Sequence, residues 1–443
     1  MTDSDPIFQV SALDAPCLDI TGQIVDVSPQ AFRVAGLSRF VRLGDCILCP
    51  GGAGDELGEV VRIEADALTV KPFGNRFSRG VNAPARRLGR FSLAPCEAWK
   101  GRVLNAFGTP CDGAGPLADG DEERFADAPP PPALRRGRVG DPVPTGVKAI
   151  DIFTPLVKGQ RIGIFAGSGV GKSTLMGMLA RAKGFDTVVV ALVGERGREV
   201  REFLEESMGG ELSRLVTIVA TGDESPMMRR LAPRTATAVA EYFRDRGENV
   251  LLIIDSITRL AHAARDVALA AGEPPVARGY PPSVFSELPQ LLERAGPGLD
   301  GSGTITGIFS VLVDGDDHND PIADAIRGTL DGHIVLDRAI AEQGRFPAVD
   351  VLKSISRLAE RAWNEQEREL VVRLRGMISR YEDTRDLRLL GGYQRGNDQT
   401  LDQAVDLVPL VYESLIQGPR EKPSTEPFNE LSRRLKKGFE PAA

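Results

Sequence analysis

The chain has 443 residues, of which 42% are hydrophobic and 26% carry a charge, as in an ordinary globular protein of two or three domains. Its net charge of −8 provides no basic footprint that would indicate duplex DNA or RNA as the main partner. The polar, acidic N-terminus lacks the features of a signal peptide, and no apolar run is long enough to span a bilayer, so we expect a cytosolic protein.

Short apolar segments separated by glycine and proline occupy residues 1–95, and this spacing predicts a small β-barrel. The expected strands include residues 23–28, 45–49, 58–63 and 67–71. Cys46 and Cys49 form a C-x-x-C pair, but no second pair and no nearby histidine would complete a zinc site. We therefore interpret the cysteines as small buried side chains of a protein in a reducing compartment.

The pattern changes after the proline run at 129–132, which cannot lie inside a helix and predicts an extended connector. Near-continuous apolar segments are typical of strands buried on both faces of a parallel sheet, and they predict strands at 161–166, 187–193, 215–220, 250–254, 304–313 and 333–336. Helices are predicted at 173–182, 235–246, 365–381 and 401–417. This order defines an α/β doubly wound domain followed by a helical region, with predicted domains 1–95, 96–358 and 359–443.

The strand predicted at 161–166 leads into a glycine-rich turn, then Lys172, Ser173 and a helix. Glycines let backbone N–H groups point at an anion, and the helix N-terminus adds a positive dipole. Lys172 would reach the β- and γ-phosphates of a nucleotide, and the Ser173 hydroxyl would hold Mg²⁺. Ala166 replaces the first glycine of the G-x-x-x-x-G-K-[ST] pattern, so the match is to its relaxed form. The expected nucleotide-binding residues are Gly167, Ser168, Gly169, Val170, Gly171, Lys172, Ser173 and Thr174.

Two carboxylates follow predicted strands at the same edge of the sheet. Asp255 comes directly after an aliphatic strand, the position from which an acid holds the water shell of Mg²⁺. Glu195 comes just after the strand at 187–193, where a carboxylate could orient an attacking water. From the residues alone, a solvated loop charge stays an alternative for Glu195, because Glu199 and Glu202 are nearby.

Four segments carry a family resemblance: residues 145–151, 166–174, 194–196 and 347–356. The last of them, Pro-Ala-Val-Asp-Val-Leu-Lys-Ser-Ile-Ser, matches the signature P-[SAP]-[LIV]-[DNH]-x₃-S-x-S. Together they resemble the alpha/beta family of rotary ATPases. Residues 165–174, 279–289 and 314–324 are further similar to the ATPases of type III protein export, and 324–338 resembles the flagellar branch. The resemblance implies an α/β P-loop (RecA-like) ATPase core with an N-terminal small β-barrel and a C-terminal helical domain.

The resemblance also implies residue roles. Glu195 matches the family's catalytic glutamate, and Arg196 matches an arginine near the γ-phosphate. Arg357 matches the arginine finger supplied to a neighbouring subunit, and Phe346 matches an aromatic that packs against adenine. Without the resemblance, Arg357 would be interpreted as a surface ion pair and Phe346 as a core aromatic. Because one chain carries the phosphate loop, Glu195 and Arg357, identical copies could complete every shared site, which predicts a homo-oligomer, most simply a hexamer.

The implied activity is hydrolysis of ATP with Mg²⁺, energising export of flagellar proteins. The implied partners are export gate, regulator and stalk proteins and chaperone–substrate complexes, which would hold the protein peripherally at the inner membrane. A virulence-type secretion ATPase is the nearest alternative. An RNA-translocating terminator-type ATPase shares the core, but the acidic balance and the lack of a basic aromatic surface in residues 1–95 argue against it. A non-hydrolysing scaffold is disfavoured by Glu195.

Overall fold

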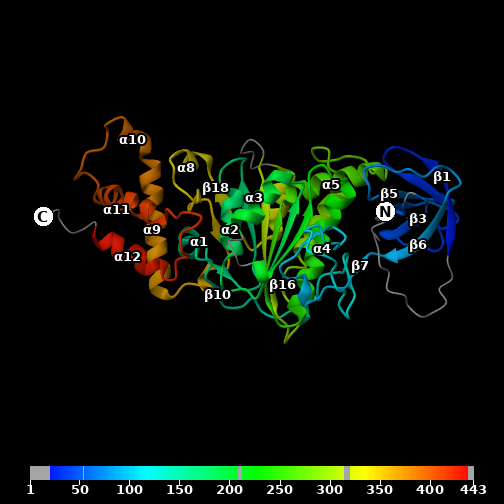
Figure 1. Ribbon diagram of the computed structural model, residues 1–443. Coiled ribbons are helices and arrows are strands. Elements are labelled where there is room, and N and C mark those ends of the chain that lie inside the picture. Colours follow the sequence, from blue (N-terminus) through cyan, green and yellow to red (C-terminus); the bar gives the residue numbers. More distant parts are fainter. Residues whose placement is uncertain (1–19, 53, 208–211, 314–319, 438–443) are drawn as a thin grey trace.

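The computed structural model describes residues 20–52, 54–207, 212–313 and 320–437. They form three bodies in a row, with a β-barrel at one end, a sheet flanked by helices in the middle and a helical group at the other end (Figure 1). The expected architecture is confirmed, whereas the boundaries 1–95, 96–358 and 359–443 stay predictions. Within the described ranges, no helix combines the length and the apolar character that crossing a membrane requires.

Six antiparallel strands close the N-terminal barrel in the order β1-β2-β5-β4-β3-β6: β1 (Thr21–Val27), β2 (Phe32–Ala35), β3 (Asp45–Cys49), β4 (Glu56–Ile63), β5 (Ala67–Pro72) and β6 (Pro84–Arg90). Alternating side chains such as Ile24, Phe32 and Val34 fill its interior. Cys46 and Cys49 are buried on β3, and burial raises the pKa of the Cys49 thiol to about 12. Both therefore serve as packing side chains, as the sequence predicted, whereas Cys111 is exposed, so the burial expected of the cysteines is wrong for that residue.

The central sheet has the strand order β19-β18-β12-β17-β15-β13-β14-β8, and all neighbours from β18 to β8 are parallel. Its strands are β8 (Val103–Asn105), β12 (Arg161–Ala166), β13 (Thr187–Val193), β14 (Leu215–Ala220), β15 (Asn249–Asp255), β17 (Thr304–Leu312), β18 (Gly332–Leu336) and β19 (Ile355–Ser356). The short β16 (Gly296–Pro297) pairs antiparallel with β17. Two further pairs are β7 (Ser92–Leu93) with β9 (Arg124–Phe125), and β10 (Pro142–Val143) with β11 (Leu156–Val157).

Two hydrophobic cores cover the two faces of this sheet. Val189 and Val250 face the core that contains α4 (Pro226–Asp245), α5 (Ile257–Ala270), α6 (Pro282–Leu292) and α7 (Pro321–Thr329). Their neighbours on the same strands, Val188 and Leu251, face the core on the other side of the sheet. That core contains α1 (Lys148–Phe153), α2 (Lys172–Ala180) and α3 (Gly197–Ser207). This alternation explains why the strands are apolar at nearly every position.

The C-terminal group consists of α9 (Glu365–Asp383), α10 (Arg385–Leu389), α11 (Gln399–Leu415) and α12 (Pro427–Lys437). Asn364 and Glu367 form a capping box at the start of α9. Buried residues of α9 and α11, including Val371 and Val408, join the core on the α1–α2 face. The short helix α8 (Arg338–Glu342) lies between β18 and this group, so it connects the sheet with the C-terminal helices.

Candidate functional site

The glycine-rich turn joins the carboxyl end of β12 to the start of α2, as the sequence predicted. Gly169 has a φ of +79° and Gly171 a φ of +92°, backbone conformations that side-chain-bearing residues rarely adopt. Helix α2 begins at Lys172, and Ser173 and Thr174 are exposed on its first turn. The first-turn N–H groups of a helix lack intrahelical partners, so this end offers amides, hydroxyls and a positive dipole to an anion.

Lys172 and Asp255 meet at this edge of the sheet. The Nζ of Lys172 lies 2.6 Å from Oδ1 of Asp255, and the hydroxyl of Ser310 donates to the same oxygen at 2.7 Å. The Asp255 side chain is only 3% exposed, so its charge is held by these two contacts rather than by water. The lysine at the start of the helix after the phosphate loop and the acid at the end of β15 are therefore brought together as expected.

Glu195 lies beside this pair. It follows β13, which pairs with β15 in a register that sets Leu192 opposite Asp255, and its Oε1 lies 3.7 Å from Nζ of Lys172. Burial, and after it the negative charge of Asp255, raises the pKa of Glu195 to about 7. A largely buried carboxyl that changes protonation near neutral pH is suited to handling a proton or orienting water.

Arg259 is a site residue that the sequence analysis missed. It lies on the first turn of α5, and its aliphatic stem packs on Gly194, where an added Cβ would be 3.0 Å from the Cβ of Arg259. Its positive charge acts to lower the pKa of Glu195. Its spacing in the sequence could have indicated this position. A residue four positions after Asp255 falls on the first turn of the helix that follows β15.

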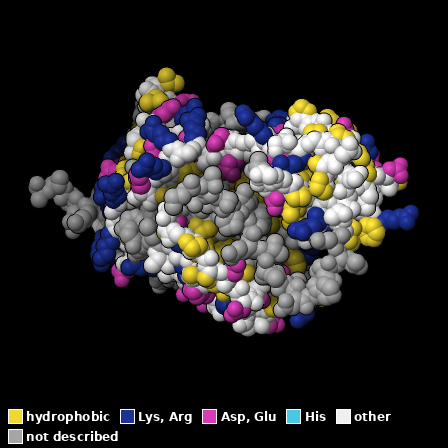
Figure 2. Space-filling model, turned by 45° about the vertical axis from the view of Figure 1, so that its right-hand side comes forward, with side chains coloured by type: hydrophobic (Ala, Val, Ile, Leu, Met, Phe, Trp, Pro, Cys, Tyr) yellow, Lys and Arg dark blue, Asp and Glu magenta, His cyan; other side chains and the backbone are white. Residues whose placement is uncertain are grey.

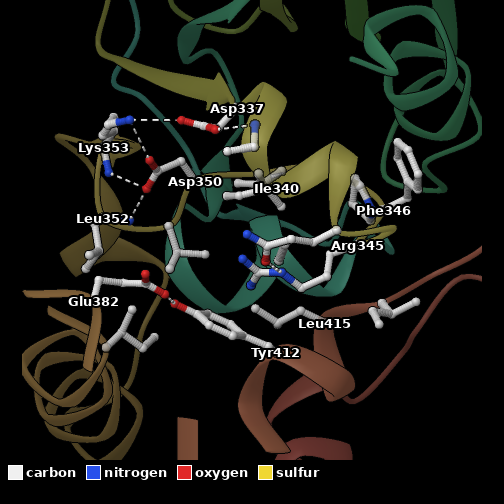
Figure 3. Close-up of a pocket in the computed structure, with 18 of the residues that line it drawn as sticks. Asp337, Ile340, Arg345, Phe346, Asp350, Leu352, Lys353, Glu382, Tyr412 and Leu415 are labelled. Carbon is white, nitrogen blue, oxygen red and sulfur yellow. Dashed lines mark hydrogen bonds and ion pairs between the residues drawn. The ribbon is translucent and has the colours of Figure 1, made fainter. Parts of the chain in front are cut away.

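Phe346 lies at the phosphate loop although it is far away in sequence. A Cβ built on Gly171 would be 3.6 Å from the Phe346 ring, which is 43% exposed. Figure 3 shows Phe346 at the margin of a cavity of about 300 Å³, which lies between residues 337–353 and the helices α9 and α11. Arg345 stacks over Tyr412 at 3.9 Å, so the chain segment that presents Phe346 is fastened to α11. An exposed ring beside a phosphate loop is positioned to cover a flat base.

The two remaining predicted residues lie outside this cluster. Arg196 is 84% exposed and pairs with Glu199 at 3.5 Å. Arg357 is exposed directly after β19, where its N–H donates to the carbonyl of Asp331, the residue before β18, at 2.9 Å. Since β18 runs parallel to β12, this is the end of the sheet opposite to the phosphate loop, and β12 spans about 16 Å between the two ends.

Two side chains at this edge of the sheet offer oxygen ligands for a metal ion. Asp255 offers a carboxylate and Ser173 a hydroxyl, the oxygen ligands that Mg²⁺ prefers. Among the described residues, no group of three or more His, Cys, Asp and Glu side chains could hold a metal by itself. Mg²⁺ in nucleotide sites typically uses one or two protein groups together with phosphate oxygens, so the residues present fit an ion that arrives with a nucleotide.

Family models match most of the chain. Residues 146–356 match the nucleotide-binding domain of the ATP synthase alpha/beta family, and residues 363–436 match the C-terminal domain of type III secretion EscN ATPases. The fold and the site thus define a nucleotide-binding ATPase of this class.

Individual relatives narrow the class. The chain is 57% identical to a flagellum-specific ATP synthase of Rhizobium meliloti (strain 1021), over 94% of this chain and 89% of that protein. It is 44% identical to a type 3 secretion system ATPase of Xanthomonas euvesicatoria, over 89% of each chain. The structure of the assembled ATPase EscN from enteropathogenic E. coli superimposes with a TM-score of 0.87 at 39% identity, covering 94% of this chain and all of that one. The chain therefore belongs to the flagellar and type III secretion branch of the ATP synthase alpha/beta family.

Proposed function

We propose that the chain hydrolyses ATP to energise export of flagellar proteins through a type III secretion apparatus. The observation that carries the chemical half is the convergence of Lys172, Asp255 and Glu195 at the carboxyl edge of the sheet, next to the glycine-rich turn. The export half is supported by the relatives, since two that are 57% and 56% identical are flagellum-specific, whereas the secretion ATPase of Xanthomonas euvesicatoria is less similar at 44%.

In this proposal the backbone N–H groups of residues 167–174 surround the β- and γ-phosphates, and Lys172 exchanges Asp255 for a phosphate oxygen. Ser173 and Asp255 hold Mg²⁺, which when bound neutralises charge on the phosphates. Phe346 stacks on the adenine, because its ring is exposed at the turn.

Glu195, in its ionised form, orients the water that attacks the γ-phosphate and takes up its proton. Arg259 packs beside Glu195 and contributes a positive charge at the same place. Arg196 is proposed as a further phosphate contact, which requires its exposed side chain to turn from Glu199 toward the site.

Arg357 lies at the opposite end of the sheet from the phosphate loop, so it cannot reach the nucleotide of its own protomer without rearrangement of the fold. It is therefore proposed to act on the nucleotide of a neighbour, in a closed ring of identical chains. The assembled form of EscN supports such a ring. The barrel exposes Val25, Phe40 and Leu43, and Figure 2 shows hydrophobic surface on the barrel side of the molecule, which suits contacts between barrels of adjacent protomers.

The proposed partners are a stalk protein, an export gate, a regulator and chaperone–substrate complexes, through which the cytoplasmic ring would sit at the inner membrane. A stalk is supported by the related complex of EscN with its central stalk EscO, which matches with a TM-score of 0.85. Nucleic acid is not a proposed partner.

The test has two arms. Purified wild-type chain should release phosphate from Mg-ATP, and Lys172→Ala should not, because the lysine that binds the phosphates is gone. In cells that lack the native gene, wild type should restore secretion of flagellar filament and hook proteins and Glu195→Gln should not. Restored secretion of virulence effectors instead of flagellar proteins would replace the flagellar assignment, and turnover stimulated by single-stranded RNA would replace the export assignment.

A further inference from the structure

The loop at residues 221–225, between β14 and α4, packs directly against the backbone of Glu195. The N–H of Gly222 donates to the carbonyl of Glu195 at 3.0 Å, and the N–H of Gly194 donates to the carbonyl of Ala220 at 2.7 Å. The approach is close enough that a Cβ on Gly222 would lie 3.0 Å from the carbonyl oxygen of Gly194. A shift of the loop at residues 221–225 would therefore displace the backbone of Glu195 and with it the Glu195 side chain.

The same loop is held from its other side by the N-terminal barrel. The Nδ2 of Asn75, in the segment after β5, donates to the carbonyl of Asp223 at 2.8 Å. The hydroxyl of Ser225 donates to the carbonyl of Phe73 and also caps α4 by accepting from the N–H of Met228. The barrel thus contacts the loop by one side-chain amide and one backbone carbonyl.

The loop is internally braced, so it can pass a displacement on. The N–H of Thr221 donates to Oε1 of Glu224 at 3.0 Å, and the N–H of Glu224 donates back to the carbonyl of Thr221 at 3.1 Å. Only two hydrogen bonds therefore separate the barrel from the backbone of Glu195. Asn75 donates to the carbonyl of Asp223, and the neighbouring Gly222 donates to the carbonyl of Glu195.

We infer that Asn75 is a positioning residue for Glu195, which acts through the loop at residues 221–225 and lets the barrel set the catalytic rate. This inference rests on the proposed role of Glu195 in hydrolysis. The phosphate loop follows β12, which is separated from β13 by β17 and β15 in the sheet. Substitution of Asn75 therefore alters the orientation of the attacking water and leaves binding of the phosphates by the phosphate loop unchanged.

The experiment compares Asn75→Ala and Asn75→Asp, which lack the donor, with Asn75→Gln, which keeps it on a longer side chain. A lost neutral hydrogen bond is worth about 1 kcal/mol, so kcat should fall roughly two- to tenfold in the first two variants, with the KM for ATP unchanged and partial recovery in Asn75→Gln. Gly222→Ala should lower kcat in the same way. The acid limb of the pH profile of kcat/KM should also move in these variants, because the pKa of Glu195 depends on its burial and on its position relative to Asp255.

The matched control is Glu59→Gln, which weakens another contact between the barrel and α4. Glu59 lies on β4 and pairs with Arg230 of α4, five residues beyond the end of the loop at residues 221–225, at 2.8 Å. It should lower the midpoint of thermal unfolding and leave kcat within about twofold of wild type. All rates are measured at protein concentrations where activity per protomer is constant, so that differences in assembly do not enter.

Two outcomes overturn the inference: Asn75→Ala and Asn75→Asp with wild-type kcat, or a fall in kcat that Glu59→Gln reproduces at equal loss of stability. Wild-type chain that binds but does not hydrolyse Mg-ATP would instead remove the proposed function. The two failures are therefore distinguishable in one set of assays.

Discussion

Replacing Glu195 with glutamine keeps the size of the side chain and removes its charge and its ability to accept a proton. A positioned general base contributes about 10²- to 10⁴-fold to a rate, so kcat of Glu195→Gln should fall by a factor in that range. ATP binding should persist, because the phosphate contacts come from the turn at residues 167–174 and from Lys172. Phosphate release and binding of a fluorescent ATP analogue, measured on the same preparation, separate the two effects.

The pH dependence sharpens this prediction. Since the pKa of Glu195 in the nucleotide-free chain is raised to about 7, only about a tenth of the sites carry the ionised carboxylate one pH unit below that value. In wild type, kcat/KM should therefore rise about fivefold from pH 6 to 7, about tenfold from pH 6 to its plateau, and level off above about pH 8. In Glu195→Gln the limb should vanish. A wild-type profile that is flat across this range, or a glutamine variant that keeps the limb, would refute the assignment.

The same shift makes a prediction about stability. Between the ordinary value of 4.5 and about 7, the folded chain keeps on Glu195 a proton that the unfolded chain has lost, so this group makes folding less favourable as pH rises through that window. Glu195→Gln should accordingly unfold at a higher temperature than wild type at about pH 8, and the difference should disappear below about pH 4.5. Calorimetry at both pH values checks the sign, and equal midpoints at pH 8 would contradict the buried placement of the carboxyl.

Further expectations concern the shared site, the base contact and the core. Mixing Lys172→Ala with Arg357→Ala protein should recover part of the turnover that each lacks alone, because some interfaces then combine an intact phosphate loop with an intact finger; no recovery would argue against shared sites. Phe346→Ala should raise the KM for ATP by about five- to tenfold, since an aromatic stack is worth about 1 kcal/mol or slightly more, and Phe346→Tyr should not. Glu241→Gln should cost about 3 to 5 kcal/mol of unfolding free energy in denaturant titration, because it strands the buried Arg294, whose guanidinium lies 2.6 Å from Glu241 and is 3% exposed. A loss of unfolding free energy under about 1 kcal/mol would show that water reaches the Glu241–Arg294 pair.

Strands of the sheet could be predicted from the sequence because burial on both faces demands apolar residues at nearly every position. The strands at 161–166, 187–193 and 215–220 have these bounds in the structure. Helix α4 was predicted from residue 235, yet it begins at Pro226, because proline is compatible with the first helical turn and Ser225 caps the helix. Pro233, inside α4, concealed the continuity of the helix in the sequence pattern.

The partners of the short elements could not be predicted. Strand β8 has only three residues and joins the sheet by pairing with β14, a contact between distant segments that leaves no periodic signal. Helix α12 is short and polar, and Leu431 is its buried anchor in the core of the α1–α2 face. Among the site residues, Lys172 and Asp255 follow from local motifs, whereas Arg259 and Asn75 gain their significance only from the fold that brings them to Glu195.

The ion pair between Lys172 and Asp255 constrains how the site can accept a nucleotide. Asp255 is almost fully buried, and Lys172 is the cation that the structure places within 3 Å of it among the described residues. If Lys172 left for a phosphate with nothing in exchange, an unpaired carboxylate would remain in the interior, at a cost of several kcal/mol. A cation that arrives with the phosphates and is shared by Asp255 and Ser173 removes this cost. We therefore expect the pair to couple nucleotide binding to metal binding, and bare ATP to be a poor ligand because Asp255 is buried.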